Sequence, residues 1–294
     1  MIILAFIGMC FASGFGWFAM KLQISTQLVA PEISLFYRFF AVSILMFAVS
    51  WLSKARLKLK KTELIYLLFI ALCNFSVNNF IGYHTTKIIP SGIIAVIFSL
   101  SVISSELIKS WLSGHKISKR IMLSGFIGTI GLAFFILPNV LHKNSSFSVI
   151  GFVYAFLMML IFSFGNYLVA CNNKKNHTPL FTTISFASAF GAGYFLLYSL
   201  IMGYQFNFDY SYSYVGSLIY QIFFASILAF ICLYYLISQI GAAKANYTAL
   251  VYPGIALLVS SFFENYQFQT ISTIGFFLII IALSLDFFYQ KIFK

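Results

Sequence analysis

Ten long runs of apolar residues, separated by short polar gaps, follow one another along the 294-residue chain. Each run is long enough for a helix that crosses a bilayer, which takes about 20 apolar residues. The runs are continuous, whereas the strands of a membrane β-barrel alternate between apolar and polar residues. The predicted spans are residues 2–22, 32–53, 63–86, 90–112, 121–139, 148–170, 178–202, 215–237, 245–263 and 271–289. The sequence therefore predicts an all-α polytopic membrane protein with ten transmembrane helices.

The scarcity of charge excludes a soluble globular protein. Charged residues make up 8% of the chain, against about a quarter in soluble domains. The net charge of +12 could indicate nucleic-acid binding, but the basic residues lie in the gaps between apolar runs, where they set membrane orientation. The four cysteines stand singly, without CxxC spacing. We expect a lipid bilayer around the protein and no nucleic-acid partner, metal site, cofactor or disulfide.

The positions of the basic residues predict the orientation. If the N-terminus is cytoplasmic, fourteen lysine and arginine residues lie in inner loops and ends, and three, Lys21, Lys87 and Lys143, lie on the outer side. Cytoplasmic loops carry such an excess, so both termini are predicted to be cytoplasmic. The first run lacks a basic leader and a small-residue cleavage site, so we expect a retained helix and not a signal peptide.

The chain also resembles itself. Residues 13–22, which lead to Pro31, match residues 162–171, which lead to Pro179, and the motif at 82–92 matches 233–243. Both pairs of segments are offset by about 150 residues. Five helices per half is an odd number, so the second half would enter the membrane from the opposite side, as in many alternating-access transporters. We predict two inverted five-helix repeats, residues 1–144 and 145–294.

Several short motifs carry a family resemblance that covers essentially the whole chain. They are Ser13-Gly14, Pro31-Glu32, Arg38-Phe39 and Ser91-Gly92 in the first half, and the segment 240–254, Phe263-Glu264 and Gly275 in the second. The chain resembles the drug/metabolite transporter (DMT) superfamily, specifically its EamA-type ten-helix members. It departs from the pattern at Ser13, Val102 and His115, which leaves the substrate open. The resemblance implies a central cavity between two halves and a bacterial inner (plasma) membrane location.

Candidate substrate-binding residues are polar or aromatic side chains inside the spans. Asn74 lies eleven residues past Glu63, hence about 16 Å deep and near the midplane. Asn78 shares its helical stripe. Unpaired amides are costly in hydrocarbon, so these side chains face either neighbouring helices or a wet cavity, and both interpretations stay open. The predicted substrate contacts are Ser13, Trp17, Asn74, Asn78, His84, Ser101, Asn166, Tyr234 and Tyr252.

Charged residues within spans are rare and mark possible coupling sites. His84 is the first candidate, because an imidazole can gain or lose a proton near neutral pH, and the alternative is a neutral, hydrogen-bonded histidine. Glu106 is the second candidate, with an ion pair to Lys109 as the alternative. Pro253 is a candidate hinge, because proline interrupts helical hydrogen bonding. Arg38 could neutralise an anionic group, but we interpret it as structural, because the resembling family has an arginine at this place across varied substrates.

The predicted function is a secondary transporter that moves a small metabolite, an amino acid or a similar zwitterionic or neutral solute, across the inner membrane by alternating access. A channel-like facilitator is the main alternative. A membrane-embedded enzyme would need paired aspartates, HExxH or another reactive motif, and the sequence has none, so no catalytic residue is assigned. A receptor or scaffold is a further alternative. We expect a small-molecule substrate and a monomer or homodimer.

Overall fold

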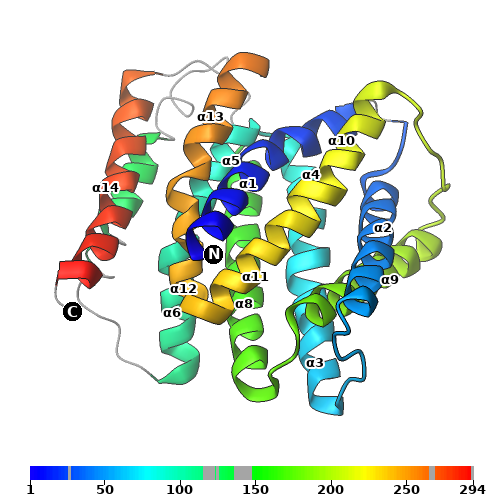
Figure 1. Cartoon of the computed structure of the whole chain (residues 1–294). Helices are drawn as coiled ribbons and strands as arrows, with labels where there is room; N and C mark the ends of the chain where they lie inside the picture. The colour runs from blue at the N-terminus through cyan, green and yellow to red at the C-terminus, as the bar shows by residue number, and fades with distance from the viewer. Residues whose placement is uncertain (26–27, 115–122, 124–125, 136–147, 265–268, 293–294) are drawn as a thin grey trace.

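A computed structural model describes the chain except residues 26–27, 115–122, 124–125, 136–147, 265–268 and 293–294 (Figure 1). The described residues form helices and no strand. The α-helices are α1 Ile2–Ser25, α2 Pro31–Leu52, α3 Lys61–Ile70, α4 Asn78–Thr86, α5 Ser91–Ser99, α6 Ser101–Ser113, α8 Val149–Asn176, α9 Leu180–Ile201, α10 Tyr212–Ile222, α11 Ala229–Ile240, α12 Ala242–Ala245, α13 Tyr252–Phe263 and α14 Thr270–Ile292. Three further segments are wider or tighter than an α-helix: the π-helical η1 Ala71–Val77 and η2 Phe223–Leu228, and the 3₁₀ helix η3 Asn246–Leu250.

Seven helices are long and apolar enough to cross a membrane. They are Ile2–Ser25, Pro31–Leu52, Lys61–Thr86, Val149–Asn176, Leu180–Ile201, Tyr212–Ile240 and Asn246–Phe263. An eighth span is possible if α5 and α6, which meet at an angle of 41°, act as one bent helix. The remaining two predicted spans, 121–139 and 271–289, correspond to the shorter apolar helices Phe126–Phe135 and Thr270–Ala282, and parts of both lie outside the described residues or side chains. The chain is a polytopic, all-helical membrane protein.

Local sequence explains where several helices begin. Pro31 is the first residue of α2, and Pro179 directly precedes α9. Proline suits a helix start because the missing N–H has no intrahelical partner there. Ser148 and Ser211 cap α8 and α10 by accepting the N–H groups of Gly151 and Tyr214 at 3.2 and 3.3 Å. The polar gaps of the sequence therefore mark the helix ends.

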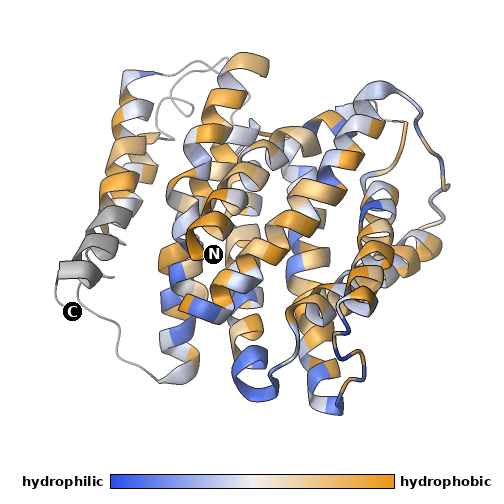
Figure 2. Ribbon diagram, in the orientation of Figure 1, coloured by the Kyte–Doolittle hydropathy of each residue, from blue (hydrophilic) through white to orange (hydrophobic). Residues whose placement is uncertain are grey.

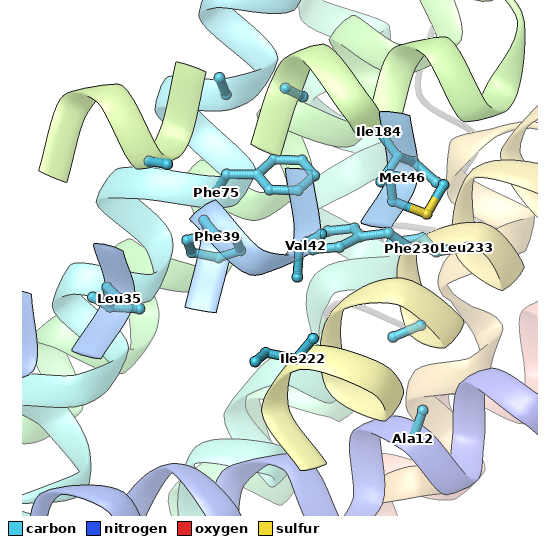
Figure 3. Close-up of a cluster of buried hydrophobic side chains, with 14 of the residues drawn as sticks. Ala12, Leu35, Phe39, Val42, Met46, Phe75, Ile184, Ile222, Phe230 and Leu233 are labelled. Atoms are coloured by element: carbon cyan, nitrogen blue, oxygen red, sulfur yellow. The ribbon is translucent and has the colours of Figure 1, made fainter. Parts of the chain in front are cut away.

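The helices form two apolar cores. The larger core lies between α2, the α3–α4 helix, α9 and the α10–α11 helix, and Figure 3 shows its central side chains. The rings of Phe39 and Phe75 are 5.4 Å apart, and Phe75 stacks on Phe230 at 4.3 Å. The second core lies between α5, α8 and α13. In Figure 1, α2 and α9 lie at one edge of the bundle and α14 at the other.

The edge helices 126–135 and α14 meet at two glycines. A Cβ atom added to Gly275 would lie 2.5 Å from the carbonyl oxygen of Gly131 and would also collide with the backbone of Phe135. Their backbones therefore touch, and only glycine fits at this crossing.

Hydrophilic residues gather at one end of the bundle, the lower end in Figure 2. This end holds the basic linker 53–60 and the C-terminal turns of α8 with Lys174 and Lys175. Glu63 joins these segments, because its carboxylate pairs with Arg56 of the linker and accepts a hydrogen bond from Thr178 at 2.9 Å. The strongest concentration of positive charge thus lies on one side of the molecule.

The two π-helical segments were not predicted. They interrupt the helices Lys61–Thr86 and Tyr212–Ile240, and their first residues, Ala71 and Phe223, are 152 positions apart, close to the offset of the sequence repeat. Side chains bond to carbonyl groups at these sites. Asn79 donates to the carbonyls of Asn74 and Phe75 at 2.8 and 3.3 Å, and Ser226 donates to that of Gln221 at 2.7 Å. Such π-bulges often occur at functional sites.

Candidate functional site

A cavity of about 100 Å³ lies in the middle of the bundle. Its walls come from α1, α2, α4, α5, α6, α8, α10, α11, α13 and the segments η2 and η3. A cavity must have a volume of roughly 10–15 Å³ to hold one water molecule. The central cavity therefore has room for a small solute of about ten non-hydrogen atoms. Both halves of the chain therefore contribute to one site.

Most of the cavity wall is aromatic or aliphatic. The rings of Trp17 and Phe98 are 4.9 Å apart, and Phe162 follows at 5.7 Å from Phe98. Phe230 and Tyr252 complete the aromatic part of the wall. Such a surface favours the apolar part of a solute, because burial removes it from water.

A few polar groups interrupt this apolar wall. They are Ser13, Asn78, Asn79, Ser101, Gln221, Asn246 and Thr248, together with Arg38. The side-chain nitrogen of Gln221 donates to the carbonyl of Gly16 at 2.7 Å, which leaves its Oε1 atom without a hydrogen-bond partner in the described structure. The Oδ1 atom of Asn78 is buried and has no partner there either. Two residues of the cavity wall therefore hold a buried acceptor without a partner among the described residues.

Arg38 is the one charged side chain among the described residues that line the cavity. Its guanidinium donates to Ser226 Oγ at 2.8 Å, to Asn79 Oδ1 at 3.3 Å and to the carbonyl of Ala225 at 3.4 Å. These partners lie in η2 and directly after η1, so Arg38 connects the two π-helical segments.

Five of the nine predicted substrate contacts line the cavity. They are Ser13, Trp17, Asn78, Ser101 and Tyr252. They lie on four helices, α1, α4, α6 and α13, and the fold brings them to one cavity. Their contact with a substrate stays a prediction.

Three other predicted contacts lie beside the cavity, in a hydrogen-bonded layer. Asn74 Nδ2 donates to Asn166 Oδ1 at 3.0 Å and to the hydroxyl of Tyr234 at 3.1 Å. Asn166 in turn donates to Asn246 at 3.3 Å, and Asn246 lines the cavity. Tyr234 also lines a second pocket of about 590 Å³ between α8, α9 and α11, near Lys174 and His177. The layer therefore lies between the central cavity and the pocket at the basic end.

The ninth predicted contact, His84, lies away from the cavity, near the start of α2. Its Nε2 atom is 3.1 Å from Glu32 Oε1, and its ring packs on Phe80 at 4.7 Å. Glu32 also raises the pKa of Tyr204 in the loop that precedes α10, because a negative charge disfavours a phenolate. His84 thus belongs to an ion-pair site at the end of the bundle opposite the basic linker.

Glu106 and Pro253 are also away from a central position. Glu106 is 3.6 Å from Lys109, as the ion-pair alternative expected, and both side chains are partly exposed. Pro253 is in the first turn of α13, after the 3₁₀ segment η3. There the 3₁₀ segment passes into the α-helix within the span Asn246–Phe263, and the role of Pro253 as a hinge stays a prediction.

A polar cluster joins the two halves near the other end of the cavity. Glu264 Oε2 accepts hydrogen bonds from the N–H of Ser91 at 3.0 Å and from Ser260 Oγ at 2.6 Å, and Lys21 lies 3.4 Å from its Oε1. Ser260 Oγ also accepts the N–H of Gly92 at 2.8 Å. The C-terminal end of α13 therefore holds the N-terminus of α5, where a negative charge is stabilised by the helix dipole.

Five polar residues of the cavity wall were not among the predicted contacts: Arg38, Asn79, Gln221, Asn246 and Thr248. Each lies within a predicted span, and this polar character inside a span was the available signal. Among the described residues no group of three metal-binding side chains is present.

Comparison with known proteins gives a family and a fold. A solved crystal structure, described only as that of a protein, aligns with 100% of this chain and 99% of its own at 13% sequence identity, with a TM-score of 0.72. No curated protein sequence matches this chain. The model of the EamA-like transporter family matches residues 1–137 and 149–287. The chain therefore belongs to the EamA-like transporter family of the DMT superfamily, whose members are membrane transporters of small solutes.

Proposed function

We propose that this protein is a secondary transporter that moves a small zwitterionic or neutral metabolite, such as an amino acid, by alternating access. One observation carries the proposal: a cavity at the centre of the bundle, lined by both halves, combines an aromatic wall with a few amides and hydroxyls. Such a site suits a solute with an apolar body and few polar groups.

The proposal includes ten transmembrane helices in two inverted repeats, residues 1–144 and 145–294. Two pairs of features support it. The proline-initiated helices α2 and α9 begin near Pro31 and Pro179, 148 positions apart, and the two π-helical segments have nearly the same offset. Inverted repeats with a site at their interface allow one half to rock against the other.

The polar clusters at the two ends of the cavity support alternation. The layer with Asn74 and Tyr234 lies towards the basic end, and the cluster around Glu264 lies on the other side. We propose that each cluster closes one side and that they open in turn. The basic end would be cytoplasmic, with both termini on that side of a bacterial inner membrane.

Counterflow in liposomes tests the function. We expect preloaded, unlabelled solute to accelerate the uptake of the same labelled solute, with saturation, for at least one member of a panel of small metabolites. Asn78→Ala removes an amide from the cavity and should raise the half-saturation concentration about fivefold, the effect of one lost hydrogen bond. Asn207→Ala is the matched control, because Asn207 is exposed in a loop.

Other outcomes would identify the alternatives. A large, non-saturable ion flux without counterflow would indicate a channel. Separate replacement of His84 and Glu106 tests proton coupling, and an unchanged pH dependence of uptake in both variants would remove them as coupling sites. Light scattering of the purified protein measures whether it is a monomer or a homodimer, as we propose.

A further inference from the structure

Arg38 carries a buried positive charge beside the central cavity. Arg38 is 3% exposed, and its guanidinium donates hydrogen bonds to neutral groups: Ser226, Asn79 and the carbonyl of Ala225. The hydroxyl of Tyr83 and the ring of Phe39 are also neutral neighbours. A buried charge is costly unless an opposite charge neutralises it. Its neighbours in the described part of the chain thus provide no counter-ion.

The acidic residues of the chain do not provide one in the described structure. The protein has six, and five have described side chains with other partners. They are Glu32 with His84, Glu63 with Arg56, Glu106 with Lys109, Asp209 with Ser211, and Glu264 with Lys21. The side chain of Asp286 lies outside the described part. The negative charge is therefore free to come from a bound solute.

A guanidinium is suited to bind a carboxylate, because its N–H groups match the two oxygen atoms. We propose that Arg38 binds the carboxylate of the transported solute and thereby selects acids over their neutral amides. This inference rests on the proposed transport function and makes its substrate class more specific. One guanidinium in a small cavity suits one carboxylate better than a polyphosphate, which needs several cations.

The other polar groups are consistent with this assignment. Gln221 Oε1 and Asn78 Oδ1 are buried acceptors without a partner among the described residues, and both residues line the cavity. As acceptors these two oxygen atoms cannot bind an anion, whereas the guanidinium of Arg38 can. Arg38 thus determines which end of the solute lies near the two π-helical segments.

Matched pairs of probes test the proposal. The pairs are amino acids, hydroxy acids and aliphatic monocarboxylic acids, each with the corresponding carboxamide. Binding is measured from the rise in unfolding temperature of the purified full chain, since a ligand of the native state stabilises it. For wild type we expect at least one acid to bind about 10- to 100-fold more tightly than its amide, the range for a hydrogen bond to a charged group.

Arg38→Gln should remove this preference, and Arg38→Lys, which keeps the charge, should keep part of it. Arg56→Gln is the matched control, because Arg56 lies outside the cavity and should leave the preference unchanged. If Arg38→Gln does not fold, the ratio of acid affinity to amide affinity is compared between the wild-type protein and Arg38→Lys, and this comparison still tests the role of Arg38.

Two outcomes overturn the inference: no acid stabilises the wild-type protein, or Arg38→Gln weakens acid and amide equally, as a purely structural arginine would. Counterflow is measured on the same panel. Saturable counterflow of neutral amides with no preference for acids would leave the transport function in place and reject the role of Arg38. Selective binding of acids without any counterflow would support the role of Arg38 and reject the transport function.

Discussion

The side-chain amide of Asn74 donates a hydrogen bond to the hydroxyl of Tyr234, 3.1 Å away, across 160 positions of the sequence. The bond joins the α3–α4 helix of the first half to α11 of the second. Both residues are fully buried, or nearly so, between the central cavity and the pocket at the basic end. This contact is therefore well placed to close the path between them.

Loss of this contact should open that path. Tyr234→Phe removes the hydroxyl, and Gly165→Ala would place a methyl group on Asn74. We expect either change to increase, by about fivefold, the rate at which a maleimide applied from the basic side labels Ser101→Cys in the cavity, as the loss of about 1 kcal/mol would. Tyr235→Phe is the control, because Tyr235 takes no part in the layer. Equal rates in all variants would contradict a barrier at Asn74 and Tyr234.

The cluster around Glu264 gives the corresponding prediction for the opposite side. Glu264→Ala removes the acceptor of the Ser91 N–H and the partner of Lys21. We expect faster labelling of Ser13→Cys by an impermeant maleimide added to the side opposite the basic linker. Lys21→Ala should have a smaller effect, since the bonds of Glu264 to α5 and Ser260 remain. A larger effect of Lys21→Ala would show that the ion pair, and not the helix contact, holds this side.

The membrane orientation can be tested with exposed positions. Tyr212, at the start of α10, is 99% exposed, and Lys58 lies in the basic linker. In intact cells, Tyr212→Cys should react with an impermeant maleimide and Lys58→Cys only after permeabilisation, because basic loops stay in the cytoplasm. The variants are made in a background without the four native cysteines. The reverse pattern would invert the topology.

Gly275 should be intolerant of any side chain. Gly275→Ala forces a methyl group against the backbones of Gly131 and Phe135, so we expect a loss of about 1–3 kcal/mol in stability, the cost of overpacking. Gly193→Ala in α9 is the control, since an added Cβ there meets no atom within 4 Å. Unfolding temperatures in detergent measure both. Similar temperatures for the two variants would show that the helices separate at this crossing without cost.

Glu63 should contribute more to stability than the partly exposed acid Glu106. Glu63 is fully buried and binds Arg56, Thr178 and the N–H of Lys60. Glu63→Gln should cost about 1–3 kcal/mol, because buried donors lose a charged acceptor. Glu106→Gln should cost about 0–1 kcal/mol, as is usual for exposed pairs. Comparable losses would mean that burial does not strengthen the Glu63 cluster.

Helix positions could be predicted from sequence because membrane spans require long apolar runs, and runs such as 32–53 and 178–202 correspond closely to α2 and α9. The directions of side chains were harder to predict. Asn74 and Asn78 were placed on one stripe by assuming a regular helix, but η1 widens the turn between them. Asn78 consequently reaches the cavity, whereas Asn74 bonds to Asn166 and Tyr234.

The environment of Arg38 could not be predicted for a different reason. A family pattern indicates that an arginine occurs at this place but not which residues surround it. Its neutral partners come from η2 and from Asn79, more than 40 positions away in each case. Such long-range packing depends on tertiary structure, so the missing counter-ion became visible only in the folded protein.

The two π-helical segments give these helices a means of changing without unfolding. Each segment holds a wide turn that contains an extra residue. If the hydrogen bonds rearrange and this turn moves along the helix, the residues that it passes rotate about the helix axis by about 100° for each extra residue. Residues between the old and new positions then exchange faces while the helix ends stay anchored. A helix of this kind can turn a cavity-lining side chain away from the cavity, so that the surface of the site itself, and not only its exits, differs between states.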